Sequence, residues 1–351
     1  MRRRTRSFAL TIVVCLLSVL PARAETIAEQ LQRQLWTYGD TTPNGWTGGD
    51  GTYSVLLPDR RVVWLFSDSF LGPTNADGSR PTNAPFVHNS MVVQNGAEYS
   101  TNLPMGYPRT LIEPPDRVTF YWVGDALVEN NELLVFVMHF AAAPAPYAFQ
   151  QIGTDVARFS LDTLTLQGVT PMPFAFAPGD DGIPVSYGAA VLRQGGYDYL
   201  YGTEDIHLDK YLHLARVPAD HLLDGAWEYW TGVDWSRVPA RAVRLMTGVA
   251  NELSVHRIGD RLALVTQDHA VGDDVMMSTA PAPEGPWSAP VAIFHIPATA
   301  GLVTYNAKAH EEFSTDHSLV ITYNANTTPT NSAALYSDIT NYRPRFVQVA
   351  I

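Results

Sequence analysis

A strand–turn–strand pattern recurs five times along the 351-residue chain and constrains its fold more than any other feature. The first copy is "WTGGDGTYSVLLPDRRVVWLFSDSF", in which two apolar runs flank a Pro58–Asp59 turn. The other copies occupy 121–140, 186–206, 251–270 and 306–326, about 55 to 75 residues apart, and one or two strand-like runs follow each. Repeats of this length predict an all-β fold, a five-bladed β-propeller with four-stranded antiparallel blades.

Composition agrees with many short strands. Prolines and glycines number 25 each and are spread throughout, aromatic residues make up 11% of the chain, and charged residues only 17%. Helical periodicity is confined to 26–36. A pair of β-sandwiches would give no reason for five similar hairpins, and a β-helix requires a much shorter repeat. The propeller is therefore the preferred interpretation.

The N-terminus has the pattern of an export signal. Basic residues precede an apolar run at 8–20, and Ala22-Arg23-Ala24 fits a cleavage site. We therefore expect a signal peptide at 1–24, a single catalytic domain at 25–351, and a secreted or periplasmic protein. An uncleaved N-terminal anchor is the alternative. Cys15, the only cysteine, lies within the signal, so the mature protein is expected to contain no disulfide and no thiol nucleophile.

The acidic balance of the chain restricts its partners. The formal net charge is −12, with no basic run outside the signal, which argues against nucleic acid and anionic membranes. A polysaccharide is the expected substrate, and a monomer is expected. Nucleotide-binding loops, H-E-x-x-H and G-x-S-x-G are missing from the sequence. No cofactor or metal is therefore expected, although Asp and Asn oxygens could hold Ca²⁺.

Polar residues concentrate at one end of the five hairpins. In a propeller the first strand of each blade lines the axis, so the start of that strand and the end of the next surround one funnel. The residues at these places are Trp46, Asp50 and Asp68; Trp122, Asp125 and His139; Tyr187, Glu204 and Asp205; Asn251, Glu252, Asp268 and His269; and Tyr305, Asn306, Lys308, His310, Asn324 and Asn326. His88 and Asn89 begin the third strand of the first repeat. The function is expected at this end.

Asp50 and Asp68 are the candidate catalytic residues. Neighbouring carboxylates repel each other, which raises one pKa and supplies a general acid beside a general base. Only the first hairpin has aspartate at both places. A structural role is the alternative for each, because Asp50 adjoins turn-forming glycines. The candidate substrate-binding residues are Trp46, His88, Asn89, Trp122, Asp125, Glu204, Asn251, Glu252, His269, Lys308 and Asn324.

The first hairpin and the following "HNSMVVQ" resemble the opening of the domain-of-unknown-function 4185 group. In that group an Asp-Gly hairpin leads to an apolar strand that ends in a Gly-Asp-Thr-like step, for which this chain has Ser67-Asp68-Ser69. The group includes glycoside hydrolase family 183, endo-D-arabinofuranosidases with a five-bladed propeller that cut mycobacterial arabinan. The resemblance implies that Asp50 and Asp68 match the family's acid pair.

The preferred function is therefore a secreted glycoside hydrolase that cuts α-D-arabinofuranosyl linkages within arabinogalactan or lipoarabinomannan. Asp50 is the preferred base and Asp68 the preferred acid, an assignment that the resemblance leaves open. Glu204 or Glu252 could replace either one. The alternatives are a furanosidase for L-arabinan or fructan, and a propeller that binds glycans without cleaving them.

Overall fold

The computed structural model describes residues 24–116, 118–144, 148–206 and 209–351. Each of the five hairpins belongs to its own antiparallel sheet, and we number these sheets I to V in chain order. Sheet I contains β2 (Tyr53–Leu56), β3 (Val62–Phe66), β6 (Ser90–Asn95) and β7 (Glu98–Thr101), and sheet II contains β8 (Phe120–Glu129), β9 (Glu132–Ala142), β10 (Phe149–Ser160) and β11 (Leu166–Pro171). Sheet IV contains β19 (Leu253–Ile258), β20 (Arg261–Gln267), β21 (Asp274–Ala280) and β22 (Val291–His295).

The other two numbered sheets depart from four strands. Sheet III has seven: β12 (Phe176–Pro178), β13 (Pro184–Gln194), β14 (Tyr197–Ile206), β15 (Asp209–Pro218), β16 (Glu228–Trp230), β17 (Trp235–Ser236) and β18 (Met246–Thr247), which pairs with β15. Sheet V has three: β23 (Leu302–Ala309), β24 (Ser318–Thr327) and β25 (Arg345–Ala350). A small extra sheet joins β1 (Trp46–Gly49), β4 (Ser69–Leu71) and β5 (Phe86–Val87). The all-β prediction is confirmed, whereas the prediction of four strands in every sheet is wrong for III and V.

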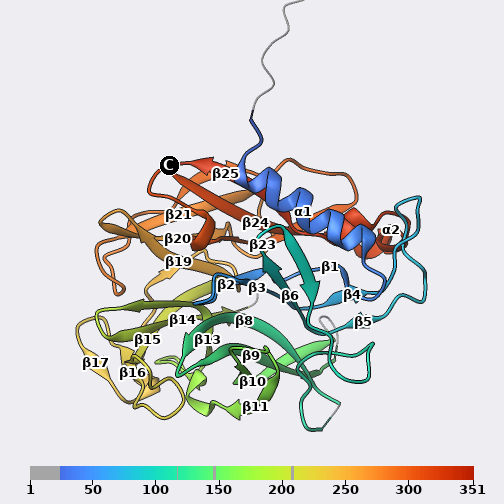
Figure 1. Ribbon diagram of the computed structural model, residues 1–351. Coiled ribbons are helices and arrows are strands. Elements are labelled where there is room, and N and C mark those ends of the chain that lie inside the picture. Colours follow the sequence, from blue (N-terminus) through green and yellow to red (C-terminus); the bar gives the residue numbers. More distant parts are fainter. Residues whose placement is uncertain (1–23, 117, 145–147, 207–208) are drawn as a thin grey trace, which may run out of the picture.

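Helix α1 (Ile27–Thr41) explains why sheet V ends at three strands. The helix starts at a Thr26–Glu29 capping box and lies along β25 (Figure 1). The Gln32 side chain accepts a hydrogen bond from the Phe346 backbone at 2.9 Å, so the helix covers the outer sheet edge as a further strand would. Short helical turns complete the described elements: α2 (Ala334–Ser337) and 3₁₀ turns at 173–175, 239–241, 311–313, 329–331 and 339–342.

The first strands of the five hairpins, β2, β8, β13, β19 and β23, lie around the centre of the molecule (Figure 1). β2 contacts β8, β8 contacts β13, β13 contacts β19, and β19 contacts β23. The Ser54 hydroxyl of β2 lies 2.5 Å from His310 Nδ1, just after β23, which links the last sheet to the first. Successive sheets therefore surround a common axis.

Apolar side chains fill the space between neighbouring sheets. Separate buried clusters join sheets I and II, II and III, III and IV, and IV and V, and a fifth joins α1 to sheets I and V. The alternation of side chains along each strand supplies these faces. Burying both faces of each sheet accounts for the nearly continuous apolar run of β3, from Val62 to Phe66, in which every residue is buried.

Turn chemistry sets the hairpin register. Asn130 and Asn131 both adopt positive φ, as do Gly195 and Gly196, in two-residue loops between the paired strands. This conformation matches the twist of the flanking strands and favours asparagine and glycine. No helix in the described part of the chain is long and apolar enough to cross a membrane. The predicted signal peptide lies almost entirely outside the described residues.

Candidate functional site

The backbone brings the two candidate acids together. The Asp50 amide donates to the Asp68 carbonyl at 3.1 Å, and the Ser67 amide donates to the Asp50 carbonyl at 2.8 Å. Beyond this point the two strands pair again as β1 and β4, with Gly49 opposite Ser69. The acids therefore lie at an interruption within a longer hairpin, where we expected its open end.

Glycine makes that interruption possible. Gly51 has φ +85°, and a Cβ on it would lie 2.9 Å from the Ser67 nitrogen. The next residue, Thr52, also has positive φ, and its hydroxyl donates to Asn324 Oδ1 at 2.8 Å. The predicted site residue Asn324 is thus buried and supports the backbone that carries Asp50.

Asp50 is half-buried and accepts hydrogen bonds from two tyrosines. The hydroxyls of Tyr305 and Tyr342 each donate to Asp50 Oδ2 at 2.8 Å. Burial and the nearby charges of Asp68 and Glu252 raise the pKa of Asp50 to about 8, although the tyrosine bonds act in the opposite direction. At neutral pH Asp50 is mainly protonated and can donate a proton.

Asp68 has different surroundings. The Trp122 indole N–H donates to its Oδ1 at 2.9 Å, and His88 Nδ1 lies 3.0 Å from the same oxygen. The predicted residues His88 and Trp122 therefore both contact the acid pair, His88 from the connection between β5 and β6, and Trp122 from β8.

A buried ion pair lies on the other side of Asp50. Lys308 is 2% exposed, and its Nζ lies 2.5 Å from Glu252 Oε2 and also donates to the Gly51 carbonyl. Asn306 donates to the other Glu252 oxygen at 2.6 Å. Burial raises the pKa of Glu252, although the positive charge of Lys308 acts in the opposite direction. Three predicted residues therefore come together here: Asp50, Glu252 and Lys308.

Two aromatic clusters flank the acid pair. On the Asp68 side, Trp122 contacts Phe140 and Phe149 with ring centroids 4.5 and 4.8 Å apart. On the Asp50 side, Tyr342 meets the Phe70 ring edge-on at 5.7 Å, and Phe86 is 49% exposed. Aromatic surface beside paired carboxyl groups is suited to holding a sugar chain, because rings pack against the apolar faces of sugars.

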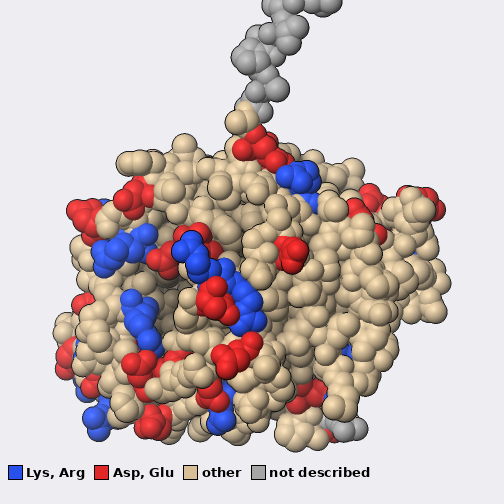
Figure 2. All heavy atoms as spheres, viewed as in Figure 1, with Lys and Arg blue, Asp and Glu red and all other residues tan. Residues whose placement is uncertain are grey.

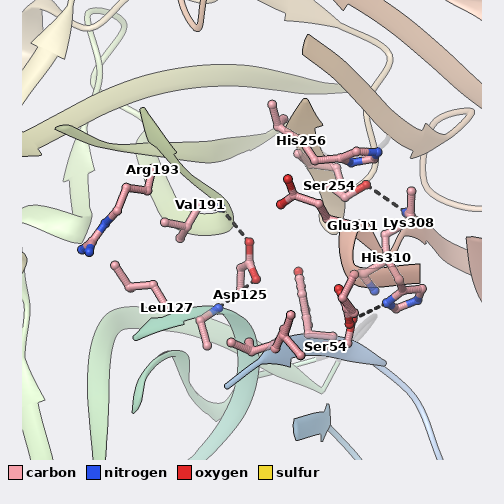
Figure 3. A pocket seen from close by; sticks show the side chains of 18 of the residues that line it. Ser54, Asp125, Leu127, Val191, Arg193, Ser254, His256, Lys308, His310 and Glu311 are labelled. Atoms are coloured by element: carbon pink, nitrogen blue, oxygen red, sulfur yellow. Dashed lines mark hydrogen bonds between the residues drawn. The ribbon is translucent and has the colours of Figure 1, made fainter. Parts of the chain in front are cut away.

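Asp125 lies in a cavity along the axis that Lys308 also lines (Figure 3). This cavity, about 520 Å³ in volume, follows the first strands toward their hairpin turns. The carboxylate accepts bonds from the backbone of Ala126 at 2.8 Å and of Val191 at 2.7 Å, which anchors β8 to β13. Burial raises the pKa of Asp125 to about 7. Asp125 was predicted to lie at the funnel with Asp68, but it occupies this other cavity.

Three further predicted residues are buried as structural groups. Trp46 is fully buried against Phe66. Asn89 is 1% exposed and satisfies backbone groups of Ile112 and Tyr121. Glu204 has no exposed surface because His213 and Arg244 pair with it. In this structure none of the three presents a side chain to a substrate.

Two more predicted residues are exposed outside the acid pair's contacts. Asn251 donates to Asp205 at 3.4 Å, and His269 Nδ1 lies 2.7 Å from Asp268. Neither contact involves Asp50 or Asp68. Both residues lie two positions outside the hairpin strands β19 and β20; the Asn251 side chain pairs with Asp205 of sheet III, and that of His269 with the adjacent Asp268.

Several site residues escaped the sequence analysis. Tyr342 lies 292 positions from Asp50 in the chain, in a 3₁₀ turn that is not part of the repeated strand–turn–strand pattern. Phe120 and Phe140 frame the sequence stretch that was recognised as the second hairpin, and their aromatic character was the one available signal. Among the described residues no cluster of three or more His, Cys, Asp or Glu is arranged to hold a metal ion.

Charges of both signs intermingle on the molecular face drawn in Figure 2. Acidic and basic side chains alternate around the centre and left of this view, whereas its right side is largely uncharged. The described residues form no continuous basic surface on this face, which is the feature that nucleic acid would require.

Comparisons with solved structures show a shared fold. A presumed hydrolase from Bacteroides ovatus superposes with a TM-score of 0.74 at 22% identity, covering 95% of this chain and 93% of that one. A protein of unknown function from Dyadobacter fermentans has a TM-score of 0.50 at 12% identity, with 87% and 83% covered. A GH32 β-fructofuranosidase from Bombyx mori also has a TM-score of 0.50, at 10% identity, with 91% and 65% covered.

Sequence comparison identifies the family. No curated protein matches the chain. One family model, that of the domain of unknown function DUF5005, matches residues 33–350. This is a different model from the 4185 group that the first hairpin resembles. Because the match spans nearly all of the chain, the protein belongs to the DUF5005 family.

Proposed function

We propose that this protein is a glycoside hydrolase in which Asp50 and Asp68 are the catalytic carboxyl groups. The observation that carries the proposal is the contrast between them. Burial and neighbouring carboxylates keep Asp50 protonated near neutral pH, whereas Asp68 accepts a hydrogen bond from the Trp122 N–H and lies 3.0 Å from His88 Nδ1. Two acids with opposed environments are the requirement for cleaving a glycosidic bond.

The chemical roles follow from these environments. Asp50 donates its proton to the leaving oxygen as the general acid. Asp68 acts as the base that activates water or as the nucleophile that attacks the sugar carbon. This assignment reverses the one we preferred from sequence, where Asp50 was the base. Tyr305 and Tyr342 hold the Asp50 carboxyl, and Trp122 orients Asp68.

The proposed scaffold is a five-bladed β-propeller. The support is that five hairpin sheets follow one another around a common axis with an apolar cluster at each junction. The fold resemblance to the Bombyx mori β-fructofuranosidase and to the presumed Bacteroides hydrolase supports a hydrolase on this scaffold, as an analogy of fold. Export through the predicted signal peptide would bring the enzyme to extracellular polysaccharide.

The proposed substrate is an arabinan with α-D-arabinofuranosyl linkages, cut within the chain. The resemblance of the first hairpin to D-arabinan-cleaving enzymes supports this choice, as do the aromatic clusters on both sides of the acid pair. The fold shared with a β-fructofuranosidase favours a second candidate, cleavage of L-arabinan or fructan.

The test is to incubate the mature protein with mycobacterial arabinogalactan, plant L-arabinan and inulin, and to analyse the released oligosaccharides. Release from arabinogalactan alone supports the first candidate, and release from L-arabinan or inulin supports the second. A protein that binds one of these glycans but cleaves none is a glycan-binding propeller, which would contradict the catalytic proposal.

A further inference from the structure

A cavity of about 320 Å³ lies next to the acid pair. Its lining comprises His88, Arg109, Thr110, Glu113, Pro114, Val118, Thr119 and Phe120. His88 belongs to both places, because its Nδ1 lies 3.0 Å from Asp68 Oδ1. Only the His88 side chain therefore separates a molecule in this cavity from the Asp68 carboxylate.

The His88 imidazole ends a stack of three rings. It stacks on Phe120 with centroids 4.4 Å apart and planes 21° apart, and Phe120 stacks on Phe140 at 5.6 Å and 12°. The His88 side chain is 43% exposed, and no second ring contacts it among the described residues. The stack fixes the imidazole while leaving part of its surface free to contact a ligand.

The charge of the cavity lining indicates a neutral ligand. Arg109 and Glu113 form an ion pair with each other, so the guanidinium is already compensated. The remaining lining combines the hydroxyls of Thr110 and Thr119 with apolar surface from Val118 and other residues. Sugars present the same combination of hydroxyl groups and apolar ring faces.

We propose that this cavity is the subsite for the neutral pentose unit that adjoins the scissile bond on the Asp68 side. The inference rests on the proposed hydrolase function and specifies its substrate. The volume is at the lower end of the range for ligand pockets, about 300–1,000 Å³, and therefore suits one sugar ring better than a chain. On the other side of the pair, exposed Phe86 near Tyr342 offers surface along which the chain continues.

Filling the cavity tests the proposal. Val118 lines it and is 80% exposed, so Val118→Trp narrows the space without disturbing the core. Val233→Trp is the matched control, because Val233 is 85% exposed and lies outside the cavity lining. With D-arabinofuranosyl oligosaccharides of three to six units, Val118→Trp should raise KM at least tenfold and leave kcat and the pH profile within about twofold. The control should match the wild type.

A binding measurement separates this inference from the proposed function. Isothermal titration of the same oligosaccharides into the Asp68→Asn protein requires no hydrolysis. Adding Val118→Trp should weaken binding at least tenfold, whereas adding Val233→Trp should not. Unchanged binding and an unchanged KM in a folded Val118→Trp protein would overturn the subsite, even if the wild type is a hydrolase. If binding weakens as expected but the wild type releases no sugar, the cavity stands as a sugar-binding site, whereas the hydrolase proposal and the place of the cavity beside a scissile bond both fail.

Discussion

Replacing Asp50 with asparagine should stabilise the protein, and the gain should grow with pH. The wild-type carboxyl has a pKa of about 8 in the folded protein, against 3.8 ordinarily. Below about pH 4 both the folded and unfolded states hold the proton, so Asp50 makes no pH-dependent contribution. Between pH 4 and 8 only the folded state holds it, so the wild type loses stability as pH rises. Asparagine has no proton to release and avoids this loss.

The structure sets the size of the effect. The full pKa difference corresponds to about 6 kcal/mol as an upper limit, at about 1.4 kcal/mol per pKa unit. Asp50 is half-buried, and solvent screening reduces the expected gain at pH 9 to about 2–3 kcal/mol. The asparagine Oδ1 can still accept bonds from Tyr305 and Tyr342, so no buried hydroxyl loses its partner.

The assay is urea unfolding of wild type and Asp50→Asn at pH 4, 6 and 9. Asp59→Asn, at the turn of the same hairpin, is the control with the opposite sign. Slight burial raises the pKa of Asp59, but hydrogen bonds from Arg61 lower it overall, so this variant should lose stability above pH 4. A stability difference between Asp50→Asn and wild type that stays constant from pH 4 to 9 would refute the reasoning.

Three further predictions concern the same site. If Asp50 is the general acid, kcat/KM should fall above about pH 8 as its carboxyl ionises; a pH–rate profile that is flat to pH 10 would argue against this role. Trp122→Phe removes the N–H donor to Asp68 and should lower kcat about 10- to 100-fold with a folded structure by circular dichroism; wild-type kcat would mean that this bond is dispensable. Lys308→Met leaves Glu252 buried without its cation and should cost about 3–5 kcal/mol at pH 7, measured by urea unfolding, and less at pH 4; equal losses at both pH values would contradict an electrostatic cause.

The fold could be predicted from sequence to the extent that it is local. Each hairpin is specified by its apolar strands and a short turn, such as Asn130–Asn131 between β8 and β9, so all five were recognised. Strand number per sheet is not local. Sheet V stops at three strands because α1, from the other end of the chain, covers β25 through contacts such as Gln32 with Phe346. No pattern within the fifth repeat carries that information.

The candidate site divides in the same way. Asp50 and Asp68 were found because one hairpin pairs them, and His88 and Trp122 because they occupy strand termini at the same end. Tyr342 could not be found, since it reaches Asp50 from 292 positions away. Other predicted site residues were misjudged because a polar residue at a strand terminus can point toward the axis or pair with other groups away from it.

Glu204 is the clearest example of a predicted site residue that pairs away from the axis. It stands near the end of β14, where a funnel residue was expected, but its side chain is fully buried and pairs with Arg244, 40 residues further along the chain. The sequence shows the carboxylate and the guanidinium, but only the packing of sheet III shows that they meet. Complete burial of the Glu204 side chain is what removes it from the candidate site.

The central claim is that Asp50 and Asp68 together cleave a glycosidic bond. The most direct measurement is the release of oligosaccharides from mycobacterial arabinogalactan by wild type, Asp50→Asn and Asp68→Asn at pH 6, with binding of the polysaccharide measured in parallel. We predict release by the wild type and a loss of at least 10³-fold in each variant, with binding retained. Release by both variants at the wild-type rate, or no release by a wild type that binds the polysaccharide, would contradict the claim.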